Sequence, residues 1–351
     1  MKDLMQLVQN MVDGYIADEK VPAISVGIIK DDQLYQYQAG YQQVINEKIP
    51  LVDNPIFDLA SLSKVTTTLM LILKLIESKE LSLMTKVKDI LIDYPDDDVT
   101  IKHLLTHTTG FPADDKSYKD CKNKDEMYEF IKKLERQQPL DTKVFYSCFN
   151  YLVLGFIIDK LKGSMADYAR EVLFDPLKMN DTGYLPITKG LKDRCVATEM
   201  TSHRGLIKGE VHDGKAFIVG GVAGNAGVFS TMEDLSHLAL MLLNDGVYNQ
   251  KQLYQKESIA LLKQSYTDHL NERRTLGWFF ADPYCQFAEK KSNTCLYHTG
   301  FTGTSMYVDF DRDCAIIILT NRVHPSRENN SIIKIRQELH GLILNYLDKI
   351  R

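Results

Sequence analysis

The stretch Phe57-Asp58-Leu59-Ala60-Ser61-Leu62-Ser63-Lys64 runs directly into the apolar segment Val65 to Glu77, which has the pattern of a helix. If Ser61 lies in the first turn of this helix, Lys64 follows one turn later on the same face, and its amine reaches the Ser61 hydroxyl. A serine hydroxyl is a weak nucleophile that needs a base, and a lysine whose pKa is depressed by burial or by another cation can serve. The helix N-terminus would add free N–H groups beside a reacting carbonyl. A Ser-x-x-Lys pair also arises by chance, with the serine as a helix cap and the lysine in solvent, so other motifs must decide between these interpretations.

The composition indicates a globular protein with no electrostatic preference for nucleic acid or membranes. The chain has 351 residues, 44% of them hydrophobic, and a formal net charge of −5. Residues Met1 to Val8 mix apolar with acidic and polar side chains, unlike a signal peptide, and no run reaches the roughly 18 apolar residues of a spanning helix. We therefore expect no membrane-spanning segment, no nucleic-acid partner and a cytoplasmic location, unless a leader has been removed.

The cysteines and histidines give no metal-site pattern. Six cysteines are scattered without paired spacing, at Cys121, Cys148, Cys195, Cys285, Cys295 and Cys314, which predicts free thiols. His103 and His107 stand four residues apart, as zinc ligands on a helix do, but Leu104 occupies the position of the glutamate of a metalloprotease. We expect a structural role for both histidines and neither a metal nor another cofactor.

Hydrophobic spacing predicts strands at both ends of the chain and helices in the middle. The predicted helices span 2–18, 65–77, 85–91, 100–106, 125–136, 148–161, 165–173 and 329–351, and the strands 23–29, 34–40, 274–280, 294–297, 304–310 and 314–320. A glycine-rich loop at 220–227 indicates close backbone approach, and the capping box Ser230-Thr231-Met232-Glu233 opens a helix through Leu243.

This order of elements predicts a single domain, 1–351, built from two interleaved lobes. An α/β lobe would be formed by about 1–60 and 265–351, and a mostly helical lobe by about 61–264, with the active site between them.

Two later motifs decide the meaning of the Ser61 segment. Tyr146-Ser147-Cys148 enters a predicted helix, and His298-Thr299-Gly300 ends a predicted strand. In this order, Ser-x-x-Lys, Tyr-Ser-x and His-Thr-Gly resemble the serine β-lactamase and penicillin-binding-protein superfamily, in the branch around class C β-lactamases, D-alanyl-D-alanine carboxypeptidases and related esterases. The resemblance covers nearly the whole chain. It implies an α/β (α+β) fold of the β-lactamase/transpeptidase type, an antiparallel sheet flanked by helices.

The same resemblance implies roles for single residues. Ser61 would be the acylated nucleophile and Lys64 its partner in proton transfer. Tyr146 would be the general base or would share a proton with Lys64, and the sequence does not decide which of the two accepts the proton first. The oxyanion hole would consist of the backbone N–H groups of Ser61 and Phe301. Cys148, His298, Thr299 and Gly300 would line the substrate.

Two residues depart from the superfamily pattern. Cys148 stands where an asparagine is frequent, and a thiol is a weak hydrogen-bond donor. His298 stands where efficient β-lactamases of this branch usually have lysine. Both changes favour esterases and peptidase-like relatives over antibiotic-degrading enzymes. Cys148 has no His–Asn partner at a recognisable spacing, so we expect an inert thiol, and His212-Asp213 is expected to be a loop contact that shapes the pocket.

We therefore expect a serine hydrolase that acts on esters or amides of small acyl substrates and reacts with covalent serine-directed inhibitors. The alternative is a penicillin-binding or D-alanyl peptidase/esterase protein of cell-wall metabolism with weak or no β-lactamase turnover. Because histidine is mostly neutral at pH 7, His298 favours neutral esters over carboxylate-bearing β-lactams. If His298 meets such a carboxylate, its recognition should strengthen as the pH falls and the imidazole protonates.

Overall fold

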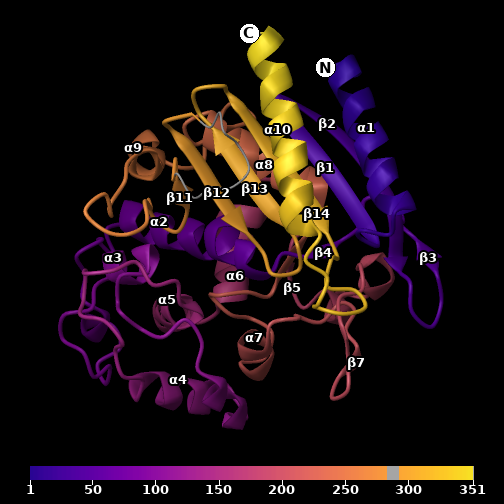
Figure 1. The fold of residues 1–351 in the computed structure, drawn as a ribbon. Coiled ribbons are helices and arrows are strands. Elements are labelled where there is room, and N and C mark those ends of the chain that lie inside the picture. Colours follow the sequence, from indigo (N-terminus) through magenta and orange to yellow (C-terminus); the bar gives the residue numbers. More distant parts are fainter. Residues whose placement is uncertain (283–291, 351) are drawn as a thin grey trace.

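A seven-stranded antiparallel sheet forms the centre of the molecule (Figure 1). The computed structural model describes residues 1–282 and 292–350. Strands β1 (Ala23–Lys30) and β2 (Gln33–Gln43) form the predicted hairpin, and β14 (Cys314–Thr320) pairs with the other edge of β1. The order β11-β12-β13-β14-β1-β2-β3 therefore joins strands from both ends of the sequence. The predicted fold class is confirmed.

The other strands of this sheet are β3 (Ile49–Pro50), β11 (Phe279–Phe280), β12 (Cys295–Thr299) and β13 (Ser305–Asp309). Outside it, β4 (Phe57–Asp58), β8 (Val228–Ser230) and β5 (Gly183–Tyr184) form one small sheet, β6 (Met200–Thr201) pairs with β7 (Gly205–Leu206), and β9 (Val247–Tyr248) pairs with β10 (Lys251–Gln252). The α-helices are α1 (Lys2–Ala17), α2 (Leu69–Glu77), α3 (Ile101–Thr106), α4 (Lys124–Lys132), α5 (Cys148–Lys162), α6 (Met165–Ala169), α7 (Gly214–Ile218), α8 (Met232–Leu243), α9 (Lys256–Ala260) and α10 (Ile332–Ile350).

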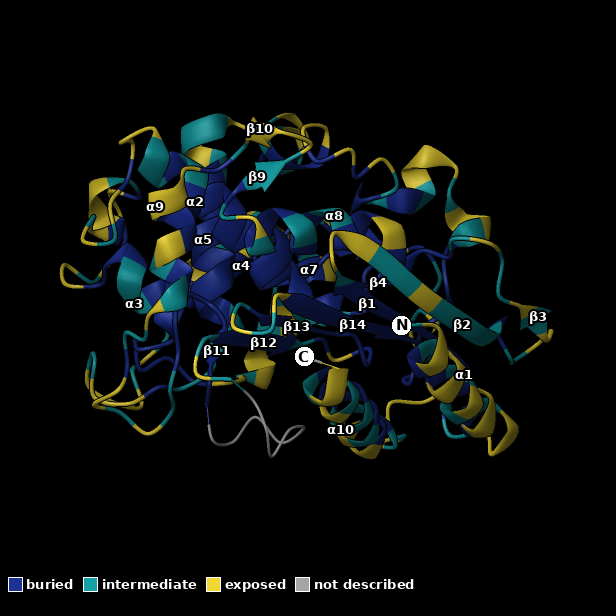
Figure 2. Ribbon diagram, turned by 90° about the horizontal axis from the view of Figure 1, so that it is seen from above, coloured by how far each residue is buried: buried dark blue, intermediate teal, exposed yellow. Residues whose placement is uncertain are grey.

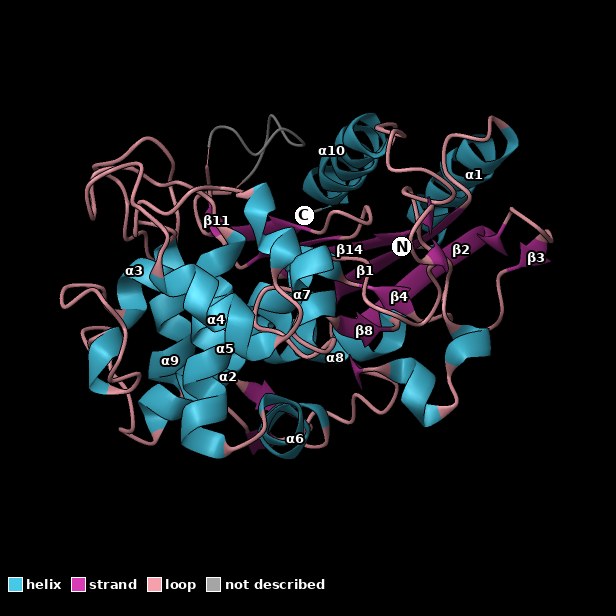
Figure 3. Ribbon diagram, turned by 90° about the horizontal axis from the view of Figure 1, so that it is seen from below, coloured by secondary structure: helices cyan, strands magenta, loops and turns pink. Residues whose placement is uncertain are grey.

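Helices cover both faces of the large sheet. Helices α1 and α10 pack on one face and α8 on the other, and the outer sides of α1 and α10 consist of exposed residues (Figure 2). The two-residue period of the strands supplies both cores: Ile316 and Ile318 of β14 face α1 and α10, while Ile317 and Leu319 face the core on the α8 side. The remaining helices gather beyond α8, around the buried α2 and α5 (Figure 3).

The glycine-rich loop packs directly against α5. A Cβ atom on Gly224 would lie 1.9 Å from the Tyr151 carbonyl oxygen, so only glycine fits at this crossing. This contact explains the glycines at 220–227 and brings the loop to the start of the Ser61 helix, where Thr68 Oγ1 donates to the Gly224 carbonyl at 2.6 Å.

Several predicted bounds are wrong. Residues 85–91 contain only the 3₁₀ turn Val87–Asp89. Most of 274–280 is not a strand, because Gly277, with φ +78°, turns the chain before β11. Thr231, and not Ser230, caps α8, accepting the Asp234 N–H at 3.2 Å. The division into lobes near residues 60 and 265 stays a prediction.

Cysteines, metal ligands and membrane segments can be assessed for the described ranges. The five described cysteines are free thiols, and Cys285 and Arg351 lie outside these ranges. Across residues 1–282 and 292–350, histidine, cysteine and acidic side chains form no group of three suited to a metal ion. Within the same residues no helix has the length and apolar character needed to cross a membrane.

The stability of the fold should decrease in acid because of His340, which lies on α10. Burial lowers the pKa of this imidazole to about 4, whereas the unfolded chain binds a proton there below about pH 6.5. Between these pH values the unfolded state binds more protons, so the free energy of unfolding decreases as the pH is lowered, by about 2 kcal/mol from pH 7 to pH 5. Urea unfolding of wild type and His340→Leu at pH 7 and 5 should show this extra loss only in wild type. The exposed His203→Leu is the control, and equal losses in wild type and His340→Leu would contradict the assignment.

Candidate active site

Ser61 and Lys64 lie one turn apart before α2. The segment is not the regular α-helix expected, because Ser61 belongs to the 3₁₀ turn Ala60–Leu62 and Lys64 opens a π-helical turn, Lys64–Thr68. The Lys64 Nζ nevertheless lies 3.0 Å from Ser61 Oγ. The pairing that the spacing predicts is therefore present in the structure.

A buried carboxylate fixes the backbone just before Ser61. Ala60 has φ +47°, a left-handed conformation that costs energy for a residue with a side chain. Its N–H donates to Asp58 Oδ1 at 2.8 Å, and Asp58 Oδ2 accepts the His212 N–H at 2.7 Å. Burial raises the pKa of Asp58, while the two N–H donors act in the opposite direction. The strained turn that presents Ser61 is thus held by a carboxylate that binds two separate chain segments.

Lys64 is a fully buried cation, with 0% of its surface exposed. Its Nζ donates to the Asn225 carbonyl at 2.8 Å and lies 3.5 Å from Cys148 Sγ. Burial acts to lower the pKa of Lys64, but Cys148 and Tyr146 together raise it to about 12. Lys64 therefore carries a proton at neutral pH and does not have the depressed pKa with which a lysine can serve as a base.

Tyr146 lies beside this ammonium, at the start of α5. Its ring centroid is 5.2 Å from Lys64 Nζ and 4.5 Å from the His107 ring. The Tyr146 hydroxyl is buried and has no hydrogen-bond partner among the described residues. Ser147 Oγ caps α5 by accepting the Phe149 N–H at 3.3 Å, which fixes the direction in which the chain leaves Tyr146.

The end of β12 closes the opposite side. A Cβ atom on Gly300 would lie 2.4 Å from the Leu59 carbonyl oxygen, so the strand passes next to the Ser61 segment only because this residue is glycine. Thr302 Oγ1 donates to the Asp58 carbonyl at 2.8 Å, and Thr304 Oγ1 donates to that of Leu59 at 3.0 Å. These bonds hold the loop of Phe301 beside Ser61, and no described residue accepts a hydrogen bond from the Phe301 N–H.

His298 is buried and neutral. Its Nδ1 donates to the Thr299 carbonyl at 2.9 Å, which leaves Nε2 as a bare acceptor without a partner in the described part of the chain. Burial, with Arg274 and Lys64 adding to it, lowers the pKa of His298 well below 6.5. In the protein without substrate, this burial opposes the protonation in mild acid on which stronger carboxylate recognition would depend.

A cleft of about 400 Å³ is lined by the predicted residues Ser61, Tyr146, His298, Thr299, Gly300 and Phe301, whereas Lys64 and Cys148 lie behind its lining. Three further lining residues were not predicted from the sequence: Arg274, Arg322 and Arg336. Arg274 is buried and forms an ion pair with Glu272. Arg274 could have been noticed in the sequence because it lies inside a predicted strand, where a charged residue is unusual. Two exposed apolar side chains also face the cleft, Phe301 with 47% and Ile333 with 52% of its surface exposed.

The histidines set aside as structural have local roles. His103 Nδ1 accepts the Thr100 N–H at 3.1 Å at the start of α3. His107 ends that helix and points instead toward Tyr146, so the two do not form a metal site. His212 Nε2 lies 2.9 Å from Glu199, and its ring stacks on Phe301 with centroids 5.5 Å apart.

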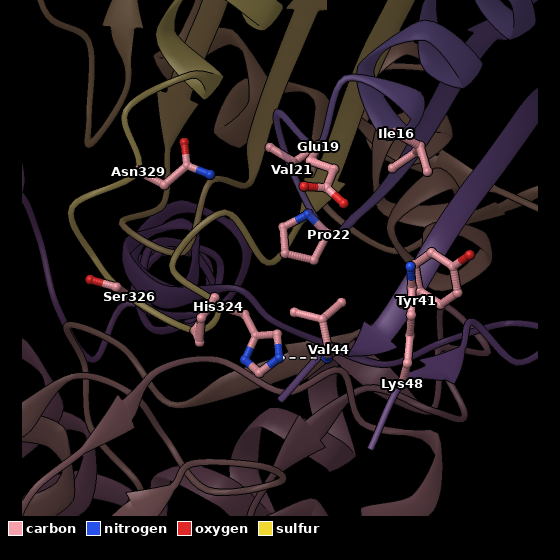
Figure 4. A pocket seen from close by; sticks show the side chains of 11 residues that line it. Ile16, Glu19, Val21, Pro22, Tyr41, Val44, Lys48, His324, Ser326 and Asn329 are labelled. Carbon is pink, nitrogen blue, oxygen red and sulfur yellow. Dashed lines mark hydrogen bonds between the residues drawn. The ribbon is translucent and has the colours of Figure 1, made fainter. Parts of the chain in front are cut away.

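A second cavity, of about 440 Å³, lies between the ends of α1 and β2 and residues 324–329 (Figure 4). His324 is the histidine in its wall. Its Nε2 accepts the Val44 N–H at 2.8 Å, and its Nδ1 donates to the Thr198 carbonyl at 2.7 Å. Both nitrogens are thus occupied. Ser326 and Lys48 also line the wall, but no hydrogen bond in the described part of the chain joins either of them to a neighbouring base, so we assign the chemistry to the Ser61 cleft.

Comparisons with known proteins agree with this assignment. A protein of Escherichia coli O157:H7 named "Putative D-alanyl-D-alanine carboxypeptidase" is 30% identical over 361 residues, which covers 90% of this chain and 82% of the relative. EstCE1, "a hydrolase with promiscuous acyltransferase activity", has a similar fold, with a TM-score of 0.75, 19% identity and coverage of 96% and 98%. A class C β-lactamase from Rhodobacter sphaeroides also has a similar fold, with a TM-score of 0.73 and 19% identity. The match covers 97% of this chain and 99% of the other. The family model described as Beta-lactamase matches residues 8–339. The chain therefore belongs to the β-lactamase family and is a serine hydrolase of that family.

Proposed function

We propose that the enzyme hydrolyses esters or amides of small acyl substrates through an acyl-enzyme on Ser61. Ser61 Oγ attacks the carbonyl carbon while its proton passes to the Tyr146–Lys64 pair. The N–H groups of Ser61 and Phe301 stabilise the oxyanion. The proton then goes to the leaving group as its bond breaks, and a water molecule releases the acyl group by the same route in reverse.

The observation that carries this proposal is the 3.0 Å contact between Lys64 Nζ and Ser61 Oγ in the cleft. Because the pKa of Lys64 is raised to about 12, this lysine starts the reaction as an ammonium donor. Its ammonium lies 5.2 Å from the ring centroid of the adjacent Tyr146, so the two side chains can exchange a proton with the same serine. This supports Tyr146, with its unpartnered hydroxyl, as the group that accepts the serine proton.

A second candidate function is recognition of carboxylate-bearing substrates such as D-alanyl peptides. The neutral His298 argues for neutral esters, but Arg274 supplies the cation that His298 lacks. The relative named as a D-alanyl-D-alanine carboxypeptidase supports the same alternative. A cell-wall substrate would require export, and the cytoplasmic location expected from the N-terminal sequence stays a prediction.

Fluorophosphonate labelling tests the nucleophile. The reagent should form one Oγ–phosphorus bond on Ser61 with loss of fluoride, seen as a single adduct by mass spectrometry. Ser61→Ala should lose both the adduct and the turnover of a nitrophenyl ester, with an unchanged melting temperature. Unfolded wild type should remain unlabelled. Turnover that survives in Ser61→Ala would refute the assignment.

Removal of one hydroxyl tests the base. Tyr146→Phe should lower the acylation rate by roughly 10²–10⁴-fold, the range of general acid–base catalysis, with little change in substrate binding. Tyr151→Phe is the matched control: its ring lies 5.8 Å from Lys64 Nζ, but its hydroxyl donates to the Leu105 carbonyl at 3.3 Å. Single-turnover kinetics measure both variants, and equal rates for Tyr146→Phe and wild type would assign Tyr146 to packing.

Variants of Arg274 test whether the enzyme recognises a carboxylate on its substrate. At pH 7 we expect wild type to hydrolyse a short nitrophenyl ester faster than a chromogenic cephalosporin. Arg274→Gln should lower kcat/KM for the cephalosporin alone, by about one to two decades, the loss of a charge-assisted hydrogen bond. Arg274→Lys keeps the charge and should retain part of this activity. Equal losses on both substrates would show that Arg274 does not contact the carboxylate.

A further inference from the structure

The loop that carries Phe301 presents its N–H groups and its carbonyls to different partners. While the Phe301 N–H has no acceptor among the described residues, the carbonyls of the loop bind Arg336. Its Nη2 lies 2.6 Å from the Gly303 oxygen, 2.8 Å from that of Thr304 and 3.4 Å from that of Gly300. One guanidinium nitrogen thus lies within hydrogen-bond distance of three carbonyl oxygens of a single turn.

The Gly300 carbonyl is the important one, because it belongs to the same planar peptide unit as the Phe301 N–H. A cation next to the oxygen of a peptide unit draws electron density from it and strengthens the N–H as a donor. Arg322 acts on the following peptide unit, where its Nε donates to the Phe301 carbonyl at 2.9 Å.

Arg336 and Arg322 are unusual in the partners of their positive charges. In the described part of the chain neither forms an ion pair with a carboxylate, whereas the nearby Arg327 pairs with Glu199. Burial lowers the pKa of Arg336, and burial followed by repulsion from Arg336 and Arg327 lowers that of Arg322. Arg322 is buried and Arg336 is partly buried, and arginines so placed are normally paired, since a charge withdrawn from water without a partner is costly. Their positive charge is therefore available to a negative charge that develops during the reaction.

The turn at 300–304 does not need Arg336 to keep its shape. The Gly300 N–H donates to the Thr304 carbonyl at 2.7 Å, and the Gly303 N–H donates to that of Gly300 at 3.0 Å. The hydroxyls of Thr302 and Thr304 fasten the turn to the Ser61 segment. The turn is thus closed and anchored without Arg336, which contributes mainly charge.

We propose that Arg336 is a positioning residue of the oxyanion hole: it aligns and polarises the Gly300–Phe301 peptide unit, so that the Phe301 N–H binds the tetrahedral oxyanion more strongly. This inference rests on the proposed acyl-enzyme mechanism. Arg336 also lines the cleft, but in this role it acts through the peptide unit and not by contact with the reacting atoms.

The test compares an oxygen ester with the thionoester of the same acyl group and leaving group. Loss of one oxyanion donor costs about 10²–10³-fold in kcat, so the weakening of one donor in Arg336→Met should lower kcat for the oxygen ester by roughly 10–100-fold, with little change in KM. The thionoester should lose much less, because its sulfur anion is a weak hydrogen-bond acceptor. Arg336→Lys, which keeps a cation, should recover part of the oxygen-ester rate and of the oxygen-to-sulfur rate ratio.

Arg312→Met is the matched control. Arg312 is likewise partly buried beside the large sheet, but it pairs with Asp309 and Asp348, and its loss should leave the oxygen-to-sulfur rate ratio unchanged. Equal losses on both esters in Arg336→Met, or no loss at all, would overturn the inference. If circular dichroism shows that Arg336→Met does not fold, Arg336→Lys replaces it in the test. An oxygen-to-sulfur rate ratio equal to that of wild type in Arg336→Lys would then overturn the inference. Failure of the acyl-enzyme mechanism itself is detected separately, as activity that survives in Ser61→Ala.

Discussion

The buried Lys64 ammonium is the constraint on which the site depends. A charge without exposed surface must be compensated by polar contacts, and in the described part of the chain no carboxylate bonds to it. The Asn225 carbonyl and Ser61 Oγ take its hydrogen bonds, and Cys148 lies within reach. Asn225 reaches Lys64 because the neighbouring Gly224 lets the loop touch α5. The glycines of this loop are thus part of the electrostatics of the site as well as of its packing.

The site also shows how positive charge is distributed around a reaction that creates negative charge. Lys64 lies beside the nucleophile, Arg274 lines the cleft, and Arg336 lies behind the loop of Phe301. Neutral His298 fits this arrangement, because the nearby cations oppose its protonation. A fourth charge at the position of His298 would increase the mutual repulsion of buried cations.

Local patterns and family resemblance predicted much of the fold and the central motifs. The spacing of Ser61 and Lys64 is a property of one helical turn, and the β1–β2 hairpin follows from alternation, so both can be read from neighbouring residues. The pKa of Lys64 could not, because it depends on Cys148 and Tyr146, more than 80 residues away in the chain. Arg336 was missed for the same reason, since its partners are backbone carbonyls that carry no sequence signal. The predicted strand at 274–280 failed because a single left-handed glycine, Gly277, outweighs the strand propensity of its neighbours.

The pairing of β1 with β14 has a consequence for synthesis on the ribosome. Ile24 faces Thr320, so one edge of the first hairpin waits for its partner until nearly the whole chain has been made. At the usual 5–20 residues per second this takes on the order of 15–60 s. During that time β1 presents unpaired backbone groups and an apolar face, features that promote aggregation of nascent chains. The helical middle of the protein, including Ser61, leaves the ribosome before the strand and loop that complete the oxyanion hole, so the enzyme acquires its activity only when its last strands are in place.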